Sequence, residues 1–430
     1  MDTGRHKEKV YSTLTGVTKF EVKWISQAAA DQRAGRSGRT GPGRCYRLFS
    51  SAVFQDFPKF PPPEIVQKPL DDLVLGMKSF GIDQIKNFPF VTAPDAQMLS
   101  NAERLCVKLG ALEGSTEKNK ISGHITSLGA TISSFPVSPR FGRILSLSAQ
   151  CGLLNYAIAL VAACTVRDMI DHTNEKMKAL KQIWTDSTKV SLGDLLVFLS
   201  AIGSTEASTE PDRFAAAIGL RQDGLREIHK LRRLIHHTVR PLMKDGDTAL
   251  LQRKISPPDA TQCRLLAELF LSGFGDQIAF RTDEENEYKI SNDSVAQIHP
   301  HSVLVKKQAS IVMYQEKSKN QKGNVYLKGC AIVTPDQVIR MATGYCKFIR
   351  VKTVPAKFDA EVGNIIGLYK VSYIPVSKEL GEHWKELVDD NETLLRCLTH
   401  ALLDGQIFSS FKNLSNKWLS PPAGMHDLWL

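Results

Sequence analysis

The sequence lacks several features that define common classes of protein. None of its eight cysteines forms a C-x-x-C pair, which argues against a zinc site and a disulfide framework and favours a reducing compartment. The longest nearly apolar run, 153–166, is too short to span a bilayer, and no signal peptide is visible, so we expect no membrane partner. The sequence also has no G-x-x-x-x-G-K-[ST] loop and no apolar strand that ends in an aspartate–glutamate box. It therefore lacks the usual groups that hold the phosphates and Mg²⁺ of ATP.

Acidic residues are fewer than basic ones. The chain has 45 Asp and Glu against 55 Lys and Arg, which gives a formal net charge of +10 and a sequence pI near 9.1. This excess favours an anionic partner, with nucleic acid the leading candidate. A length of 430 residues predicts about two to four domains, and the 42% hydrophobic content supports well-packed cores.

The stretch 32–39 reads Q-R-A-G-R-S-G-R and concentrates cationic side chains. Arg36 and Arg39, spaced by three, share one face if the segment is helical. A guanidinium group makes bidentate contacts with phosphate oxygens. Gly35 and Gly38 disfavour a helix, so their presence suggests that another molecule or another part of the protein approaches the backbone closely. The alternative is an arginine-rich turn that is simply solvated.

The full string Q-R-x-G-R-x-G-R, preceded by I-S-x-A-x-A at 25–30, resembles motif VI of superfamily 2 helicases, in the form of the DEAH/RHA-box RNA helicases. The resemblance implies that Gln32, Arg36 and Arg39 face ATP phosphates across a cleft between two RecA-like domains. Arg36 and Arg39 would be the catalytic arginine fingers. An arginine finger stabilises charge on the transferring phosphoryl group and contributes ~10³–10⁵ to the rate in related NTPases. The implied cofactor is ATP, with Mg²⁺ held by a first RecA-like domain that this sequence lacks. We therefore expect the chain to begin inside the second RecA-like domain.

Residues 1–57 flank this motif. Two strands, 7–12 and 18–24, are expected around a turn at 13–17. In the helicases that the chain resembles, such a hairpin separates RNA strands, and Lys7, Lys9 and Lys19 would bind RNA phosphates. A solvated edge hairpin is the alternative. After the motif, 44–49 is predicted to be a buried strand that closes the RecA-like sheet, and the proline-rich run 57–63 marks a domain boundary.

The middle of the chain is predicted to be helical. Residues 64–130 suit three helices with a small wing, a winged-helix unit that carries few basic residues and serves as a hinge. Residues 131–271 read as all-α, with 151–166 buried on every face. Within them, 224–240 is amphipathic, and its basic side is a candidate RNA-binding face or a solvated stripe: Arg226, Lys230, Arg233 and His237. His229, His236 and His237 lack accompanying carboxylates or cysteines that would complete a ligand set, so no metal site is expected.

Residues 272–352 alternate in polarity over several short runs, which suits an OB-fold barrel that binds single-stranded nucleic acid. The expected strands are 277–281, 288–290, 295–298, 302–305, 311–314 and 326–333. The string Q-I-H-P-H-S at 297–302 resembles the OB-fold signature Q-I-H-P-x-S of the same helicases. His299 and His301 are interpreted as loop structure rather than as catalysts.

Residues 353–430 form a C-terminal extension with an acidic stretch. An apolar helical face is predicted there, either docked on the chain or open to a partner: Trp384, Leu387, Leu394, Leu395, Leu398 and Leu402. This extension, the T-G-V hairpin loop at 15–17 and the G-R-S-G-R-T-G-P-G string at 35–43 resemble the nucleolar DEAH-box helicases of small-subunit ribosome assembly. That resemblance implies pre-ribosomal RNA and ribosome-assembly proteins as partners, and location in the nucleus and nucleolus.

The expected fold is therefore multidomain α+β. It comprises the tail of a RecA-like α/β domain (1–57), a winged helix (64–130), a helical ratchet-like domain (131–271), an OB-fold β-barrel (272–352) and the extension (353–430). Two functions remain open. The chain is either the C-terminal half of an ATP-dependent RNA helicase, inactive alone, or a non-catalytic module that binds RNA or a partner protein.

Overall fold

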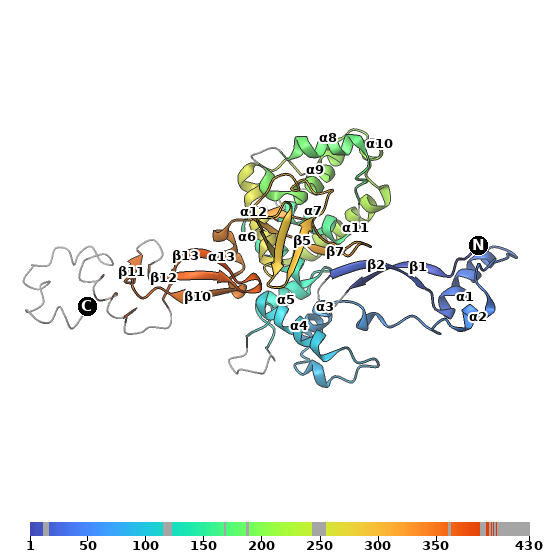
Figure 1. Ribbon diagram of the computed structural model, residues 1–430, viewed down its shortest axis with the longest axis horizontal. Helices are drawn as coiled ribbons and strands as arrows, with labels where there is room; N and C mark the ends of the chain where they lie inside the picture. The colour runs from blue at the N-terminus through green and yellow to red at the C-terminus, as the bar shows by residue number, and fades with distance from the viewer. Residues whose placement is uncertain are drawn as a thin grey trace, which may run out of the picture. The chain divides into compact units, whose positions relative to one another are not determined.

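The computed structural model describes residues 1–11, 17–114, 123–166, 169–185, 189–242, 255–359 and 363–387, together with 393, 394, 397, 399 and 401. The chain divides into two compact units, Met1–Gln337 and Val338–Leu430, whose elements are labelled in Figure 1.

The first unit begins with the predicted hairpin. Strands β1 (Arg5–Tyr11) and β2 (Val17–Trp24) pair antiparallel from Arg5↔Trp24 to Tyr11↔Thr18. Helix α1 (Gln27–Gly35), the 3₁₀ helix η1 (Arg36–Gly38) and helix α2 (Ser51–Gln55) follow. Ile25, Ala30 and Phe57 form a small buried cluster beneath them.

The strand expected at 44–49 is wrong. Arg47 makes one isolated parallel bridge with Asp2, while Tyr46 and Leu48 are 60% and 57% exposed. Parallel strands are stable when neighbours pair with them and both faces are covered. Within the described residues, this segment pairs only through that bridge, so it does not form a regular strand. The RecA-like tail therefore stays a prediction.

Residues 64–133 pack around their own buried cluster, which includes Val74, Leu99 and Ile132. The elements are η2 (Glu64–Val66), α3 (Asp71–Ser79), η3 (Ile85–Asn87), α4 (Ala96–Lys108) and α5 (Ser127–Ser133). Asp95 caps α4 by accepting the backbone N–H groups of Gln97 and Met98. An antiparallel bridge joins Leu112 to Ile125. The winged-helix assignment stays a prediction.

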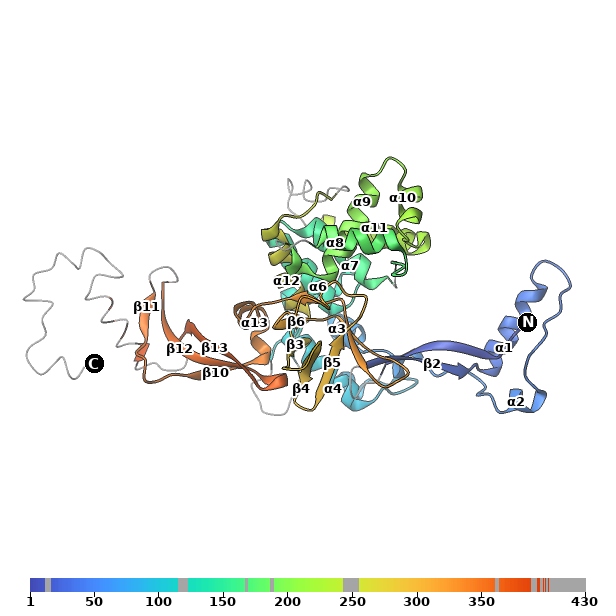
Figure 2. The ribbon, with the colours of Figure 1, turned by 45° about the horizontal axis from the view of Figure 1, so that its top comes forward.

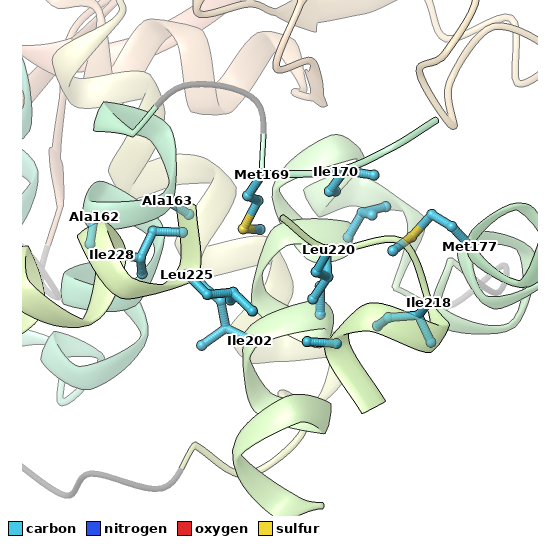
Figure 3. Packing of buried hydrophobic residues seen from close by; sticks show 13 residues of the cluster. Ala162, Ala163, Met169, Ile170, Met177, Ile202, Ile218, Leu220, Leu225 and Ile228 are labelled. Carbon is cyan, nitrogen blue, oxygen red and sulfur yellow. The ribbon is translucent and has the colours of Figure 1, made fainter. Parts of the chain in front are cut away.

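A bundle of helices follows, as the sequence predicts: α6 (Pro139–Gln150), α7 (Leu154–Thr165), α8 (Glu175–Trp184), η4 (Val190–Leu192), α9 (Asp194–Ala207), α10 (Pro211–Ala217), α11 (Gln222–Val239), η5 (Arg240–Leu242) and α12 (Ala260–Gly273). Helix α7 is buried on all sides, in agreement with its uniformly apolar sequence. Figure 3 shows its Ala162 and Ala163 against Ile228 of α11, with Met169, Leu220 and Ile202 beside them.

Short strands form the last part of the first unit: β3 (Ile278–Arg281), β4 (Glu287–Ser291), β5 (Ser294–Ile298), β6 (Ile311–Met313), β7 (Glu316–Lys319), β8 (Val325–Lys328) and β9 (Ala331–Ile332). With the hairpin they make a nine-stranded sheet of order β1-β2-β7-β8-β5-β4-β3-β6-β9. Strand β7 was not predicted. The expected strand 326–333 is split at Gly329, which has a φ of +63°.

The strand expected at 302–305 is wrong, because these residues form turns. The backbone N–H of Val303 donates to the carboxylate of Asp194 rather than to a neighbouring strand. A donor used in this way is not available to a β-ladder.

The second unit contains a sheet in which β12 (Asn364–Tyr373) is central (Figure 2). Strands β10 (Cys346–Arg350) and β11 (Lys357–Asp359) pair antiparallel with β12 along one edge, and β13 (Lys378–Glu386) pairs antiparallel along the other. Helix α13 (Pro335–Met341) spans the boundary between the units, and η7 (Thr343–Tyr345) and η8 (Ile374–Val376) are short turns.

The helix expected around Trp384 is wrong at that position, because Trp384 lies in β13 opposite Leu368. Ser377, at φ +54°, turns the chain back, and a bulge at Val371/Ser372 sets the register. Pairing along β12 satisfies the backbone here and outweighs the helical spacing of the apolar residues. Leu395, Leu398 and Leu402 lie outside the described residues. None of the described helices is long and apolar enough to cross a membrane.

Candidate functional site

The motif at 32–39 is presented by a short, well-anchored helix. Ser26 caps α1 by accepting the backbone N–H of Ala29 at 3.1 Å. Ala30 is fully buried, and the Gln27 amide donates to the carbonyl oxygen of Phe54 at 3.2 Å. The lead-in I-S-x-A-x-A therefore has a structural role, which is to fix the orientation of the residues after it.

The arginines of this motif have two different environments. Arg33 forms an ion pair with Asp2, with Nη1 and Oδ1 3.0 Å apart, and also donates to the carbonyl oxygen of Arg5. Gln32, Arg36 and Arg39 are exposed, and their side chains make no hydrogen bond or ion pair with the described part of the chain. Arg36 and Arg39 both have right-handed helical φ and ψ, so their spacing of three places them on one side of the turn.

The glycines around these arginines leave room for an external group. A Cβ atom added at Gly35 or Gly38 would meet no atom within 4 Å, so the backbone there is open to solvent. Gly43 differs, because a Cβ there would lie 1.8 Å from the carbonyl oxygen of Ser37. Gly43 therefore lets the following loop pack against η1. The open side of η1 is the side on which an anion could approach.

The hairpin extends the sheet of the OB-like strands. The start of β2 pairs in parallel with β7, through Val17↔Lys317, Thr18↔Ser318 and Lys19↔Lys319. Lys7 is exposed on β1. The side chains of Lys9 and Lys19 lie outside the described residues, so their predicted RNA contacts stay predictions. The sequence contained no signal for the β2–β7 pairing, since the two strands are about 300 residues apart.

Helix α11 has the two faces that its sequence indicates. Leu225, Ile228, Ile235 and Val239 are buried. Arg226, Lys230, Arg233 and His237 are exposed along the other side. Arg226 forms an ion pair with Asp223 at 2.9 Å, which offsets its charge.

The buried side of α11 also carries a charged group that was not predicted. Arg232 is buried and pairs with Glu206 of α9, and His229 Nδ1 lies 3.7 Å from the same carboxylate. The expectation that His229 has no carboxylate nearby is therefore wrong. Burial lowers the pKa of His229, and the Glu206 charge opposes that shift only in part. Within the described residues, no cluster of three or more His, Cys, Asp or Glu side chains could hold a metal ion.

Asp194, at the start of α9, and the Q-I-H-P-x-S string at 297–302 meet in the structure, which their separation in the chain did not reveal. The Asp194 carboxylate accepts the Ser302 hydroxyl at 2.8 Å and the backbone N–H groups of Val303 and Cys330 at 3.0 Å each. A Cβ at Gly193 would lie 2.3 Å from the carbonyl oxygen of Cys330, so only glycine fits there. The serine of the Q-I-H-P-x-S string therefore holds the OB-like strands against helix α9.

Arg140 of α6 makes a second connection between these segments. Its guanidinium donates to both carboxylate oxygens of Asp276, at 2.6 and 2.7 Å, and to the carbonyl oxygen of Gly273. Burial alone would raise the pKa of Asp276, but the Arg140 charge overcomes this and lowers it. The bidentate geometry fixes the orientation of α6 relative to the start of β3.

His299 and His301 lie in the loop after β5, as expected, and take part in an aromatic cluster. The His301 ring is 4.6 Å from the His172 ring and 5.0 Å from the His299 ring, measured between centroids. The Lys181 ammonium lies 2.8 Å from His172 Nδ1 and donates to the carbonyl oxygen of His301. These contacts again join the helical segment to the OB-like strands, and they give the two histidines a structural role.

Two family models match the chain in the segments just described. Residues 138–216 match the helicase-associated HA2 domain, which is ratchet-like, and residues 266–345 match the oligonucleotide/oligosaccharide-binding (OB) fold. These matches confirm the predicted ratchet-like and OB-fold domains. The fold and the two domains define the helicase-associated region of an RNA helicase.

Relatives cover the whole chain. It is 35% identical over 470 aligned residues to the probable ATP-dependent RNA helicase DHX37 of Homo sapiens, covering 100% of this chain and 40% of that protein. It is 34% identical to the probable helicase kurz of Drosophila melanogaster, covering 100% and 39%. It is 34% identical to the probable helicase DHR1 of Saccharomyces cerevisiae, covering 68% and 26%. The chain spans about two fifths of the human relative. It belongs to the DEAH-box family of RNA helicases and corresponds to their C-terminal half.

Proposed function

We propose that this chain supplies the arginine fingers and the RNA-binding domains of an ATP-dependent RNA helicase acting on pre-ribosomal RNA, and that it hydrolyses no ATP by itself. The observation that carries the proposal is the division among the arginines at 33–39. Arg33 is used to anchor the helix, whereas Gln32, Arg36 and Arg39 are exposed on an open turn without internal partners among the described residues.

The residues present fit one side of a nucleoside triphosphate. Two guanidinium groups on one turn can each make bidentate contacts with phosphate oxygens, and the amide of Gln32 lies one helical turn before Arg36. ATP bound between RecA-like domains supplies the phosphoryl group. In this chain, Arg36 and Arg39 would place positive charge beside the phosphate oxygens, and Ser26, Ala30 and Arg33 would hold the helix that carries them.

A phosphate-binding loop and metal ligands are the complementary half of such a site. The 430 residues contain no G-x-x-x-x-G-K-[ST] sequence. We therefore expect the isolated chain to hydrolyse ATP no faster than buffer, as measured by phosphate release.

The arginine fingers are tested in a chimera that joins the N-terminal part of the human relative to residues 1–430 of this chain. Arg36→Ala or Arg39→Ala is expected to reduce ATP turnover by ~10³ or more, because each removes charge stabilisation from the transferring phosphoryl group. RNA affinity should be retained. Arg44→Ala is the matched control, because Arg44 is also exposed and lies five residues beyond Arg39. Full turnover in both finger variants would contradict the assignment.

The proposed RNA target and location rest on the hairpin loop, the glycine-rich form of the motif and the C-terminal extension. A comparison of sequence identities supports this target. The chain is 35% identical to the human helicase, but 27% identical to the pre-mRNA-splicing factor prp22 of Schizosaccharomyces pombe. Crosslinking in cells is expected to recover pre-ribosomal RNA and ribosome-assembly proteins, and a fluorescent fusion is expected in the nucleolus. Recovery of spliceosomal RNA instead would contradict the proposed target.

The second candidate is a non-catalytic module that binds RNA or a partner protein. The exposed cations of α11 and the OB fold favour RNA. Two measurements together separate the two candidates: filter binding of RNA by the isolated chain, and ATP turnover by the chimera. RNA binding together with wild-type turnover in the Arg36 and Arg39 variants would favour the module.

A further inference from the structure

The sheet of the second unit has two faces with different charge. Residues directly opposite one another in a ladder point to the same face, and successive residues alternate. One face carries three lysines (Lys347, Lys357 and Lys370) and four acidic residues (Asp359, Glu379, Glu382 and Glu386), by the register of β10, β11 and β13 on β12. We call this the mixed-charge face.

The opposite face carries positive charge and aromatic rings. Among the described residues of the sheet, the pairing places no acidic side chain on it. We call it the basic–aromatic face and define it by five residues: Phe348, Arg350, Tyr369, His383 and Lys385. The register itself assembles this set, since Arg350 and His383 lie on either side of Tyr369.

The basic–aromatic face is ordered by contacts between its own members. The Lys385 ammonium lies 4.2 Å from the centroid of the Phe348 ring, and the Phe348 and Tyr369 rings meet edge-to-face at 6.3 Å. Lys385 is in β13, which pairs with one edge of β12, and Phe348 is in β10, which pairs with the other edge. The lysine side chain therefore reaches across the central strand. Phe348, Arg350, Tyr369 and His383 are partly exposed and Lys385 is exposed, so the face is accessible.

Gly367 gives Arg350 its position. A Cβ atom at Gly367 would lie 2.9 Å from Arg350 Nε and 3.0 Å from Cζ, so the guanidinium lies over the bare backbone of β12. Arg350 Nε is shielded and has no hydrogen-bond partner. A guanidinium group presents both a planar stacking surface and donors for a phosphate.

We propose that the basic–aromatic face binds single-stranded RNA, with the bases stacking on Tyr369 and Phe348 and the phosphates contacting Arg350 and Lys385. Sequence-tolerant binding of single strands uses this combination of aromatic platforms and cations. The absence of carboxylates from this face, against their presence on the other, provides the charge complementarity. The proposal rests on the proposed RNA-binding function, and it adds a contact outside the OB-fold match, which ends at residue 345.

The first test measures the charge contribution with the full chain and a fluorescent uridine dodecamer, by anisotropy at several KCl concentrations. Lys385→Ala is expected to weaken binding several-fold and to reduce the salt slope by about 0.7, the value for one phosphate contact on a single strand. Lys347→Ala is the matched control, because it removes the same exposed charge from the mixed-charge face. Equal effects of the two variants would overturn the proposal.

The second test addresses stacking. Tyr369→Leu is expected to weaken binding about tenfold, because it removes a π-face from beneath a base. Tyr369→Phe should retain wild-type affinity, which separates stacking from loss of fold. Ultraviolet crosslinking of the wild-type complex should label peptides from β10, β12 or β13. Crosslinks that map only elsewhere would overturn the proposal. If an acidic protein rather than RNA is found to cover the basic–aromatic face, RNA is the wrong occupant and the proposal fails.

Failure of this inference and failure of the proposed function give different results. If the wild-type chain binds RNA and only variants of α11 weaken it, the basic–aromatic face is not an RNA site while the helicase assignment stands. If the wild-type chain binds no RNA at low salt, both fail.

Discussion

Single side chains in this protein show how one residue type takes different roles within a few positions. Arg33 and Arg36 are three residues apart, yet Arg33 is committed to Asp2 and Arg36 is exposed. Arg140 is committed to Asp276, and its charge also acts on a second carboxylate, Asp71. The effect of a charged residue therefore depends on the partners within reach rather than on its type.

Asp71 provides a prediction at this scale. Burial raises the pKa of its carboxyl to about 6, and the neighbouring Arg140 charge lowers it only in part. Because the folded pKa lies above the unfolded value, this group favours the folded state most below about pH 4 and loses that contribution as pH rises through 6. Asp71→Asn is therefore expected to stabilise the protein at pH 7, by about 1–3 kcal/mol.

Urea unfolding of the Asp71→Asn variant and the wild type at pH 4, 5, 6 and 7 would measure this. The gain should grow from pH 4 to pH 7. Asp56→Asn removes a carboxylate from an exposed position and is the matched control. A gain that is constant across this range would mean that Asp71 does not titrate there.

At the scale of elements, helix α11 combines packing and charge on opposite sides. Its buried residues and the Arg232–Glu206 pair fix it against α7 and α9, so its exposed lysine and arginine are held in a constant position. A rigid row of cations suits phosphates at regular spacing better than cations on a loop do. This is the basis for proposing the face as an RNA contact.

We predict that the double substitution Lys230→Ala and Arg233→Ala weakens RNA binding by the full chain. The salt slope should fall by about 1.4, for two contacts on a single strand. Arg264→Ala, an exposed change on α12, is the control. If filter binding shows the same salt dependence in wild type and double variant, the stripe on α11 is only solvated.

At the scale of the whole molecule, the helical segment and the OB-fold strands of the first unit are joined at several points. Asp194 binds Ser302, Val303 and Cys330, and Arg140 binds Asp276. Both contacts are partly buried, where charge-assisted hydrogen bonds are stronger than on the surface. We infer that these two domains unfold together.

Breaking the Arg140–Asp276 pair tests this inference. Arg140→Ala leaves a partly buried carboxylate without its partner and is expected to destabilise the unit by about 2 kcal/mol, between the values for exposed and fully buried pairs. It should also separate one unfolding transition into two. Arg213→Ala breaks an exposed pair with Glu210 and should cost less than about 1 kcal/mol. Calorimetry of the three proteins measures both effects, and a single unshifted transition in Arg140→Ala would contradict the joint unfolding.

Local patterns predicted much of what the structure contains. The hairpin at 5–24, the buried helix α7 and the two faces of α11 follow from the spacing of apolar residues and from turn chemistry. Motif VI and the Q-I-H-P-x-S string were recognised by residue type and spacing alone, and the family matches confirm the ratchet-like and OB-fold domains. These features depend on neighbours within a few positions, so the sequence by itself determines them.

The errors and omissions concern partners that are distant in the chain. Residues 44–49 and 302–305 have strand-like sequences, but one lacks neighbouring strands among the described residues and the other gives its backbone donor to Asp194. Trp384 has helical spacing to Leu387, but β12 pairs with its segment. The link between Gly193-Asp194 and Ser302, the β2–β7 pairing and the basic–aromatic face were likewise decided by tertiary structure. Such pairings depend on which backbone groups and charges meet in space, and spacing along one segment carries no information about that.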